Sequence, residues 1–581
     1  MAERIVSPGV FTREVDQSFL PAGLAAIGAA VIGPTAKGPA GIPTIVTSYS
    51  DFIQKFGGAF TSGSGATESS YKYLTNYSAQ EYLKYADTLT VVRILGANYS
   101  PAEAAVTCSG VAASAFTLYT LSDGADMNSV GPEGINNTLA SGSINNIRWE
   151  VSNVSTAKGT FTLLIRRGDD TSKRKIILEQ FNNVTLDPNS NNYIAKVIGD
   201  QSYTVKDSGT TDPFLQLSGS YVNRSNFVRV DVSRTTYNYL DANGTIRDNA
   251  LSASLPAAVS GTFADGSDGT VAHPRMFNED ITNTNTQGFN LATAGSGKTA
   301  YTDAILLLKN QDEYDINLLS LPGLVDNFAN HATVISTALT ALEDRSDAFL
   351  LIDPVEYGSS IGTAVAKAEA RDTNYAATYW PWIKIPDADL GRNVWVPAST
   401  LIPSVYAFND RVAAPWYAPA GLNRGALDIA VQTERKLTQS NRDTLYEAAV
   451  NPIATFPNSG VVVYGQKTLQ KKSSALDRVN VRRLLIAAKK FVASATKYLV
   501  FENNTAATRN RFLSIVNPYF ESVQQRQGLY AFKVVMDDTN NTPDVIDRNE
   551  MRGAIYLQPA KTAEFIIIDF NILPTGAAFP E

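Results

Sequence analysis

The stretch Ala294 to Thr299 (AGSGKT) has the residue types of a phosphate-binding loop. Such a loop carries a first glycine five positions before the Gly-Lys pair and follows an apolar strand, so that its backbone N–H groups converge on phosphate. In this chain Ala292 occupies the first glycine position, and the residues upstream include NTNTQGFN. The sequence therefore does not predict nucleotide binding, and we expect no cofactor.

Histidine chemistry would have to use His273 or His331, the two histidines of the chain. His273 lies in an Ala-His-Pro loop, whereas His331 lies at the start of a predicted helix, where a capping or packing role is expected. One cysteine and two histidines cannot complete a Cys/His zinc site, and neither G-x-S-x-G nor H-E-x-x-H occurs. We therefore expect no enzyme activity of these kinds.

Two acidic stretches offer oxygen ligands. The loop Asp537 to Glu550 (DDTNNTPDVIDRNE) lacks the mid-loop glycine and the glutamate spacing of a calcium-binding hand. Asp387 and Asp389 precede Gly391, a setting in which carboxylates form turns or cap helices. We predict a solvated connection between strands for the first stretch, a turn or cap for the second, and a metal site at neither.

The composition is that of an ordinary globular chain. Its 581 residues are 44% hydrophobic and 18% charged, which indicates three or four domains. The net charge of −7 argues against nucleic acid as the main partner. A single cysteine, Cys108, is typical of a protein made in a reducing cytosol. Gly23 to Gly33 is too short and too rich in Gly and Ala to span a bilayer, so no direct membrane insertion is expected.

Apolar periodicity then indicates the elements that must position these residues. In the first 99 residues it predicts a short helix capped by Ser50 or Asp51 and a buried strand from Leu89 to Leu95. From 100 to 295, Ser, Thr, Asn and Gly dominate between short alternating runs, which predicts a β-rich insertion.

The second half of the chain has a different pattern. From 296 to 455 strands and helices alternate, which predicts parallel βαβ units. Residues 456–563 predict a mixed α+β domain, which ends in strand-like runs. The predicted elements of the βαβ part are strands at 316–321, 349–352 and 377–385 and helices at 329–342 and 363–371.

The predicted helix from Val481 to Leu499 is basic. Its apolar residues form one stripe by three- and four-residue spacing, and most of its Lys and Arg lie outside that stripe. From 461 to 500 there are nine Lys or Arg and one acid, Asp477. Two interpretations stay open: a solvated helix face, or a docking face for an acidic partner.

Both ends of the chain contain strand-like segments. The C-terminal segment is apolar on both faces, and an open edge of this kind is an aggregation hazard, so it must pair with another strand. Two alternatives remain: the ends complete sheets within their own subunit, or they exchange between copies. The N-terminal segment comprises Val10, Phe11, Thr12, Arg13, Glu14 and Val15, and the C-terminal one includes Phe565, Ile566, Ile567, Ile568, Phe570 and Ile572.

Several stretches resemble the contractile tail sheath proteins of myoviruses, which are phages with contractile tails. The stretches are SPGVFTREVD at the start, INLLSLPG and LLIDPVE in the βαβ part, VPASTLIPSVYAFNDRVAAPWYAPAGLNRGAL after it, and NPIATFPNSGVVVYGQKTL with VNVRRLLIAAKKFV toward the C-terminus. The resemblance covers roughly residues 1–95 and 300–581 and leaves out the insertion.

The resemblance implies a multidomain α/β and α+β fold. It implies arms that cross between subunits, so that exchanged terminal strands join a sheet in the C-terminal domain. It also favours the docking interpretation for Arg482, Arg483, Lys489 and Lys490, which would face the tail tube. The implied parts are an N-terminal arm (1–25), the N-terminal part of the sheath core (26–99), a β-rich inserted outer region (100–295), a subtilisin-like α/β domain without protease chemistry (296–455), an α+β C-terminal domain (456–563) and a C-terminal arm (564–581).

The function implied by the resemblance is that of a structural subunit of the contractile tail sheath. Stacked hexameric rings would polymerise around the tail tube protein as a metastable extended helix and contract to drive the tube through the host envelope for genome delivery. Baseplate and tail terminator proteins are further implied partners, with the virion tail as the location and the host cytoplasm as the site of assembly. Alternatives are a sheath subunit of a non-phage contractile injection system, a subtilisin-like hydrolase and a carbohydrate-binding tail protein.

Overall fold

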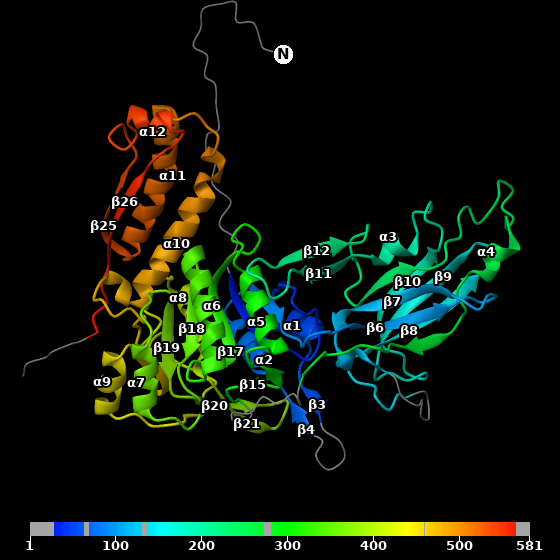
Figure 1. Ribbon diagram of the computed structural model, residues 1–581, viewed down its shortest axis with the longest axis horizontal. Helices are drawn as coiled ribbons and strands as arrows, with labels where there is room; N and C mark the ends of the chain where they lie inside the picture. Colours follow the sequence, from blue (N-terminus) through cyan, green and yellow to red (C-terminus); the bar gives the residue numbers. More distant parts are fainter. Residues whose placement is uncertain (1–27, 63–68, 130–137, 272–280, 458, 565–581) are drawn as a thin grey trace, which may run out of the picture.

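The computed structural model describes residues 28–62, 69–129, 138–271, 281–457 and 459–564. Figure 1 shows three parts. An α/β core lies at the lower left, a slender unit built on the long helices α10 (Val479–Thr496) and α11 (Ala506–Gln525) stands above it, and a β-rich part extends to the right. The predicted mixture of α/β and β-rich parts is therefore confirmed.

The core contains one eight-stranded sheet. Its six inner strands run parallel, and the edge strands β2 and β24 run antiparallel to their neighbours. Parallel strands covered on both faces need apolar side chains on both sides, and every residue of β1, β5 and β18 is buried. In spatial order the strands are β2 (Thr44–Val46), β5 (Leu89–Arg93), β1 (Gly28–Gly33), β17 (Ile316–Val325), β18 (Phe349–Asp353), β19 (Ala376–Trp380), β23 (Val450–Phe456) and β24 (Gly460–Val463).

Two apolar layers cover this sheet. Successive residues of β1 point to opposite faces, so Ala29 and Val31 join one layer while Ala30 and Ile32 join the other. The first layer contains residues of α1 (Tyr49–Phe56), α2 (Leu74–Tyr82) and α8 (Ala398–Val412), and the second contains residues of α5 (Ser296–Leu307), α6 (Ala329–Arg345), α7 (Ile361–Glu369) and α9 (Gln439–Glu447).

Most predicted elements of the core are present, and two are corrected. The helix near residue 50 is α1, but its cap is Ser48, whose hydroxyl accepts the backbone N–H of Asp51 at 3.2 Å. The strand expected at 377–385 is two strands, because the chain leaves the core sheet after Trp380. The second strand belongs to a small separate sheet of β20 (Ile383–Asp387), β21 (Arg392–Val396) and β22 (Gln432–Thr433).

The core sheet joins segments that are far apart in the sequence. β1 lies between β5 and β17, so the strands before residue 95 complete the sheet that the later strands continue. β24 pairs with β23, so the core extends past the expected boundary at 455. Core packing also resumes at Ile281 and Phe289, before the expected boundary at 295, beside a hairpin of β15 (Asn285–Thr286) and β16 (Phe289–Asn290).

The part between residues 100 and 271 is rich in strands, as its composition predicts. A three-stranded and a four-stranded antiparallel sheet share one apolar cluster, in which the rings of Phe116 and Phe161 stack with centroids 5.7 Å apart. The sheets are β6 (Pro101–Thr107), β7 (Ser114–Asp123) and β13 (Val228–Val232); β8 (Ile147–Ser155), β9 (Thr160–Arg167), β10 (Ile177–Thr185) and β14 (Ser260–Thr262); and the hairpin β11 (Ser202–Lys206) with β12 (Phe214–Ser218).

The C-terminal part is the predicted α+β unit. Its core gathers Leu484 and Ala488 of α10, Phe512 and Val516 of α11, and Leu529 at the start of β25. The acidic stretch 537–550 joins β25 to β26, as expected for a connection between strands. The elements after α11 are β25 (Leu529–Val535), α12 (Pro543–Asp547) and β26 (Ala554–Pro559).

Candidate assembly site

The C-terminal domain offers an incomplete sheet. Within the described residues β25 and β26 pair only with each other, so the outer edge of each strand carries no ladder partner. β25 packs against α11. On β26, Ile555 and Leu557 point toward the helices, whereas Tyr556 between them is exposed. A sheet this small is marginally stable alone, and the open edge of β26 can accept a further strand.

A groove runs beside β26 along α10. Near the core a cavity of about 560 Å³ is lined by Leu485, Val492, Ile555 and Leu557 together with residues of the core such as Arg345. A second cavity of about 970 Å³ continues past Val492 and Ile555, which line both, toward the turn after α10. We call the two cavities the α10–β26 groove. The walls are mainly apolar in the cavity near the core and mixed polar and apolar in the second cavity, which suits the alternating side chains of an extended segment.

The far end of the groove exposes apolar side chains. Tyr498 is 72% exposed, Val500 is 63% exposed, and Phe501 is fully exposed with a φ of 71°. A left-handed backbone is unfavourable for an aromatic residue and is found where a site imposes it. These residues give the tip of the C-terminal domain an exposed apolar surface.

The four basic residues predicted to face the tube do not share one surface, because α10 is covered on two sides. Val479 and Ile486 pack into the core, while Leu484 and Ala488 pack into the C-terminal domain. The prediction of an exposed basic face is therefore wrong for three of the four. Arg482, Arg483 and Lys490 are buried, and Lys489 is exposed.

Each buried cation has an identifiable environment. The Arg482 guanidinium lies 3.5 Å from the ring centroid of Tyr375, and burial lowers the pKa of Arg482. Arg483 pairs with Asp410 at 2.5 Å. The Lys490 ammonium pairs with Asp315 and donates to the carbonyl of Ile316 at 2.7 Å, with Asp347 3.3 Å away. These contacts tie α10 to the core rather than to a partner.

Replacing Lys490 with methionine is expected to lower the free energy of unfolding by about 2–3 kcal/mol, because the buried carbonyl of Ile316 and the partly buried carboxylate of Asp347 lose a charged partner. The matched change Lys489→Met, one residue earlier and exposed, is expected to change it by less than about 0.5 kcal/mol. Urea unfolding followed by tryptophan fluorescence measures both. Equal losses in the two variants would contradict the assignment of Lys490 to the interior.

The predicted arm residues at 10–15 and 565–572 lie outside the described residues. The described chain begins, however, close to the groove. Gly28, the first residue of β1, is in register with Ile316, whose carbonyl accepts the Lys490 ammonium. The first described residue, Gly28, therefore lies near the Lys490 part of α10, where Lys490 also lines the groove.

The motifs that suggested chemistry have structural roles. Gly295 and Gly297 open α5, and a side chain at either position would meet the carbonyl oxygen of Asn290 at 2.4 or 2.8 Å. Glycine is therefore needed there because α5 packs closely on β16, and no phosphate is required to explain it. Asp387 accepts the backbone N–H groups of Asp389 and Leu390, which confirms the predicted turn.

His331 has the predicted packing role. Its Nδ1 accepts the backbone N–H of Val325 at 3.1 Å, and its Nε2 lies 2.8 Å from the carbonyl of Thr282, so the neutral ring donates to that carbonyl. Burial lowers the pKa of His331 to about 4. The ring is fully buried and uses both nitrogens in these bonds.

A serine and an aspartate meet in the core without a histidine between them. Ser399 donates both its backbone N–H and its hydroxyl to Asp353, at 2.9 and 2.5 Å, and both residues are buried. Burial raises the pKa of Asp353 to about 7. This carboxylate lies at the N-terminal end of α8, where a helix dipole favours negative charge. Ser399 thus anchors a helix instead of presenting a nucleophile.

Acidification is expected to destabilise the fold through His331. The unfolded chain binds a proton with a pKa near 6.5, whereas the folded chain does so near 4. The contribution of the neutral ring is therefore complete above about pH 6.5 and is lost as the pH falls toward 4, by up to about 3 kcal/mol. Urea midpoints of the native chain and of His331→Gln between pH 7.5 and 4.5 isolate this effect, since Asp353 is present in both. Parallel pH profiles would contradict it.

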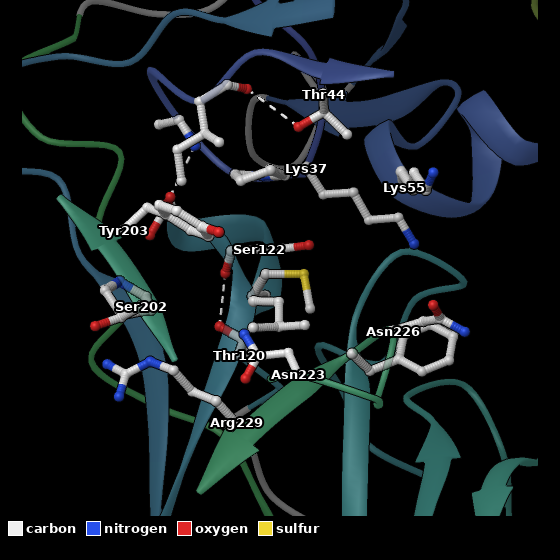
Figure 2. A pocket seen from close by; sticks show the side chains of 18 of the residues that line it. Lys37, Thr44, Lys55, Thr120, Ser122, Ser202, Tyr203, Asn223, Asn226 and Arg229 are labelled. Carbon is white, nitrogen blue, oxygen red and sulfur yellow. Dashed lines mark hydrogen bonds between the residues drawn. The ribbon is translucent and has the colours of Figure 1, made fainter. Parts of the chain in front are cut away.

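A further cavity of about 690 Å³ lies between the β-rich part and the core. Figure 2 shows that Lys37, Thr44 and Lys55 of the core face Tyr203 and Arg229 of the β-rich part across it. Polar side chains and apolar surface both line it, and it lies between the two parts. Among the described residues no group of three or more His, Cys, Asp or Glu could hold a metal ion, and no described helix is long and apolar enough to cross a membrane.

Comparison with known proteins shows which family models and relatives parts of the chain match. A family model described as the phage tail sheath protein central domain matches residues 294–469, and one described as the phage tail sheath C-terminal domain matches residues 471–572. Tail sheath proteins of Vibrio phage KVP40 and Enterobacteria phage T4 are 43% identical over 190 residues and 40% identical over 189 residues. These stretches are 33% and 32% of this chain.

The same stretches span only 28% and 29% of the two phage proteins. A crystal structure of a sheath tail protein from Listeria innocua has the same fold over nearly the whole chain, with a TM-score of 0.52, 11% identity, and coverage of 92% of this chain and 96% of that one. Each of these relatives is a tail sheath protein. Residues 294–469 and 471–572 of this chain thus match the two domain models of phage tail sheath proteins.

Proposed function

We propose that the protein is a subunit of a contractile tail sheath, which polymerises as stacked rings around the tail tube. The observation that carries the proposal is the α10–β26 groove beside an unpaired strand edge, in the domain that matches the sheath C-terminal model. A subunit that leaves a sheet incomplete and an apolar groove open is built to receive a segment from another copy.

The segment proposed for the groove is a terminal arm of a neighbour. The alternation at 565–572 offers one apolar face to the groove and backbone groups to the edge of β26. The N-terminal arm at 10–15 is the second candidate, since Gly28, the first described residue, lies near Lys490, which lines the groove. Exchange of both arms would give heterologous contacts, which extend into a helical filament when they do not close into a ring.

Contraction is proposed to be a rigid-body rearrangement of such subunits. The extended lattice is held by a kinetic barrier, and new contact area between the α/β cores supplies the driving free energy. The core is proposed to be subtilisin-like in topology without protease chemistry, in keeping with the structural roles of Ser399 and His331. The β-rich part extends from one side of the core, as expected for an outer domain (Figure 1).

The tube contact is proposed to involve Lys489, the one exposed member of the four predicted basic residues. An exposed charge of this kind sets orientation while contributing little free energy, so the sheath can release the tube. The tail tube, the baseplate and the tail terminator are proposed partners, and the virion tail, with assembly in the host cytoplasm, is the proposed location.

Electron microscopy of the purified full-length chain tests the proposed function. Incubation at increasing protein concentration is expected to give tubes or stacked rings of uniform width. A chain that remains strictly monomeric at every concentration, alone and with its tail tube protein, would refute the proposal.

A further inference from the structure

Glu564, the last residue that the structure describes, is held by side chains from three places in the fold. Arg478, the residue before α10, donates from Nε and Nη2 to the two carboxylate oxygens at 2.7 and 3.0 Å. Tyr446 of α9 donates its hydroxyl at 2.9 Å, and Gln466, which follows β24, donates its amide at 3.1 Å. We call this set the Glu564 clamp. Gln466 also donates to the hydroxyl of Thr562 at 2.6 Å.

The clamp has the features of a strong attachment. A two-pronged contact between a guanidinium and a carboxylate is directional as well as charged. The side chains of Arg478 and Glu564 are 26% and 18% exposed, so solvent screens the pair only in part. The backbones of two clamp segments are also joined, because the carbonyl of Gln466 accepts the N–H of Val479, the residue after Arg478, at 2.9 Å.

The clamp belongs to the core. Tyr446 lies on a helix of the second apolar layer, and Gln466 follows an edge strand of the core sheet. The last strand of the C-terminal domain ends at Pro559. Between Pro559 and Glu564 the chain therefore leaves the small sheet of the C-terminal domain and is tied back to the core, so whatever follows residue 564 starts from the core.

We propose that the Glu564 clamp anchors the root of the C-terminal segment, residues 565–581, to the α/β core of its own subunit. A neighbour that holds this segment is then linked to the core of this subunit. The anchoring follows from the described contacts, whereas the link to a neighbour rests on the proposed function.

The anchoring is tested on the unassembled full-length chain. A nitroxide label is attached at Lys561→Cys, an exposed position inside the tethered stretch, in a Cys108→Ser background. Glu564→Ala and Glu564→Gln remove the negative charge of the carboxylate. Arg478→Glu reverses the charge of its partner. The double variant Arg478→Glu with Glu564→Arg restores a pair of opposite charges and is expected to restore the contact. Glu521→Gln, at an exposed position of α11, is the matched control.

The single changes at the clamp are expected to raise the ratio of mobile to immobile label roughly tenfold, as for loss of a charge-assisted contact, while the control leaves the spectrum unchanged. The double reversal is expected to restore most of the immobile fraction, which general damage to the fold would not allow. An unchanged spectrum in Glu564→Ala, or no recovery in the double reversal, would overturn the anchoring.

A second readout separates the clamp from the proposed function. The concentration at which tubes form is expected to rise roughly tenfold in Glu564→Ala and to recover in the double reversal. A mobile label with an unchanged assembly concentration would overturn the link to a neighbour and leave the anchor. A label that becomes mobile in Glu564→Ala, together with a native chain that never forms tubes, would confirm the anchor and refute the sheath function.

Discussion

Removal of residues 565–581 is expected to give a folded, soluble chain that no longer forms tubes. The cut follows Glu564, so every described contact of the C-terminal domain and the core remains. What is lost is the strand proposed to fill the α10–β26 groove of a neighbour. Losing about eight paired residues is expected to raise the concentration needed for assembly at least about a hundredfold, or about 2.7 kcal/mol per contact.

The measurements are sedimentation velocity for assembly and circular dichroism for folding. A shorter deletion of residues 574–581, which leaves the strand pattern at 565–572 in place, is the control and is expected to assemble normally. Deletion of residues 1–17 is expected to have the same effect as the longer C-terminal deletion. Tubes of normal width and stability from either long deletion would show that the corresponding arm is not exchanged.

The second large effect is expected at Arg93, which joins the β-rich part to the core. This arginine is buried at the end of β5, and burial lowers its pKa. Its guanidinium donates to the carbonyls of Thr35, Gly38 and Asp123 at 3.1, 2.7 and 2.6 Å. Asp268 lies 3.8 Å away. The chain passes from the core to the β-rich part near residue 96 and returns to the core near residue 268. Arg93 therefore contacts the chain close to both of the connections between the two parts.

Arg93→Met keeps most of the side-chain volume and removes every donor. It is expected to lower the free energy of unfolding by about 3–5 kcal/mol, because several buried carbonyls lose their only charged partner. The control is Arg247→Met at an exposed position, expected to change it by less than about 0.5 kcal/mol.

Hydrogen exchange locates the loss. In Arg93→Met, protection is expected to fall first at residues 35–41 and 96–101, where backbone hydrogen bonds join the two crossings. Urea unfolding gives the size of the effect. A loss below about 1 kcal/mol, or reduced protection confined to the far end of the β-rich part, would contradict the role of Arg93 as the joint between the two parts.

The sequence predicted local structure well where one periodicity ran without interruption. The run LTVVR is β5, the pattern from 329 to 342 is α6, and the stripe from 481 to 499 is α10. It was less accurate where short-range signals competed. Three residues near the start of α1 have side chains that can cap a helix: Ser48, Ser50 and Asp51. Ser48 is the cap because the extended backbone ends and the helix begins at that residue. The strand at 377–385 was interrupted because the chain leaves one sheet to join another.

The candidate site was predicted in part. The sequence indicated that α10 has an apolar stripe, but a stripe reports one buried face. It could not show that the core covers a second side and buries Arg482, Arg483 and Lys490. The sequence does contain the acidic partner of Lys490, which is Asp315. The two residues are 175 positions apart and become partners only in the folded chain, so no local pattern indicates the pair.

The sequence by itself determined most of the elements, the strand-rich character of the insertion, the packing role of His331 and the resemblance to tail sheath proteins. Each of these depends on residue type and on spacing over a few turns or strands. Only the tertiary structure decided that β1 lies inside the core sheet between β5 and β17, that three of the four basic side chains are buried, that a groove stays open beside β26 and that Glu564 is tied to the core. Those features are set by contacts between segments tens to hundreds of residues apart, whose free energies depend on burial and geometry that no local pattern contains.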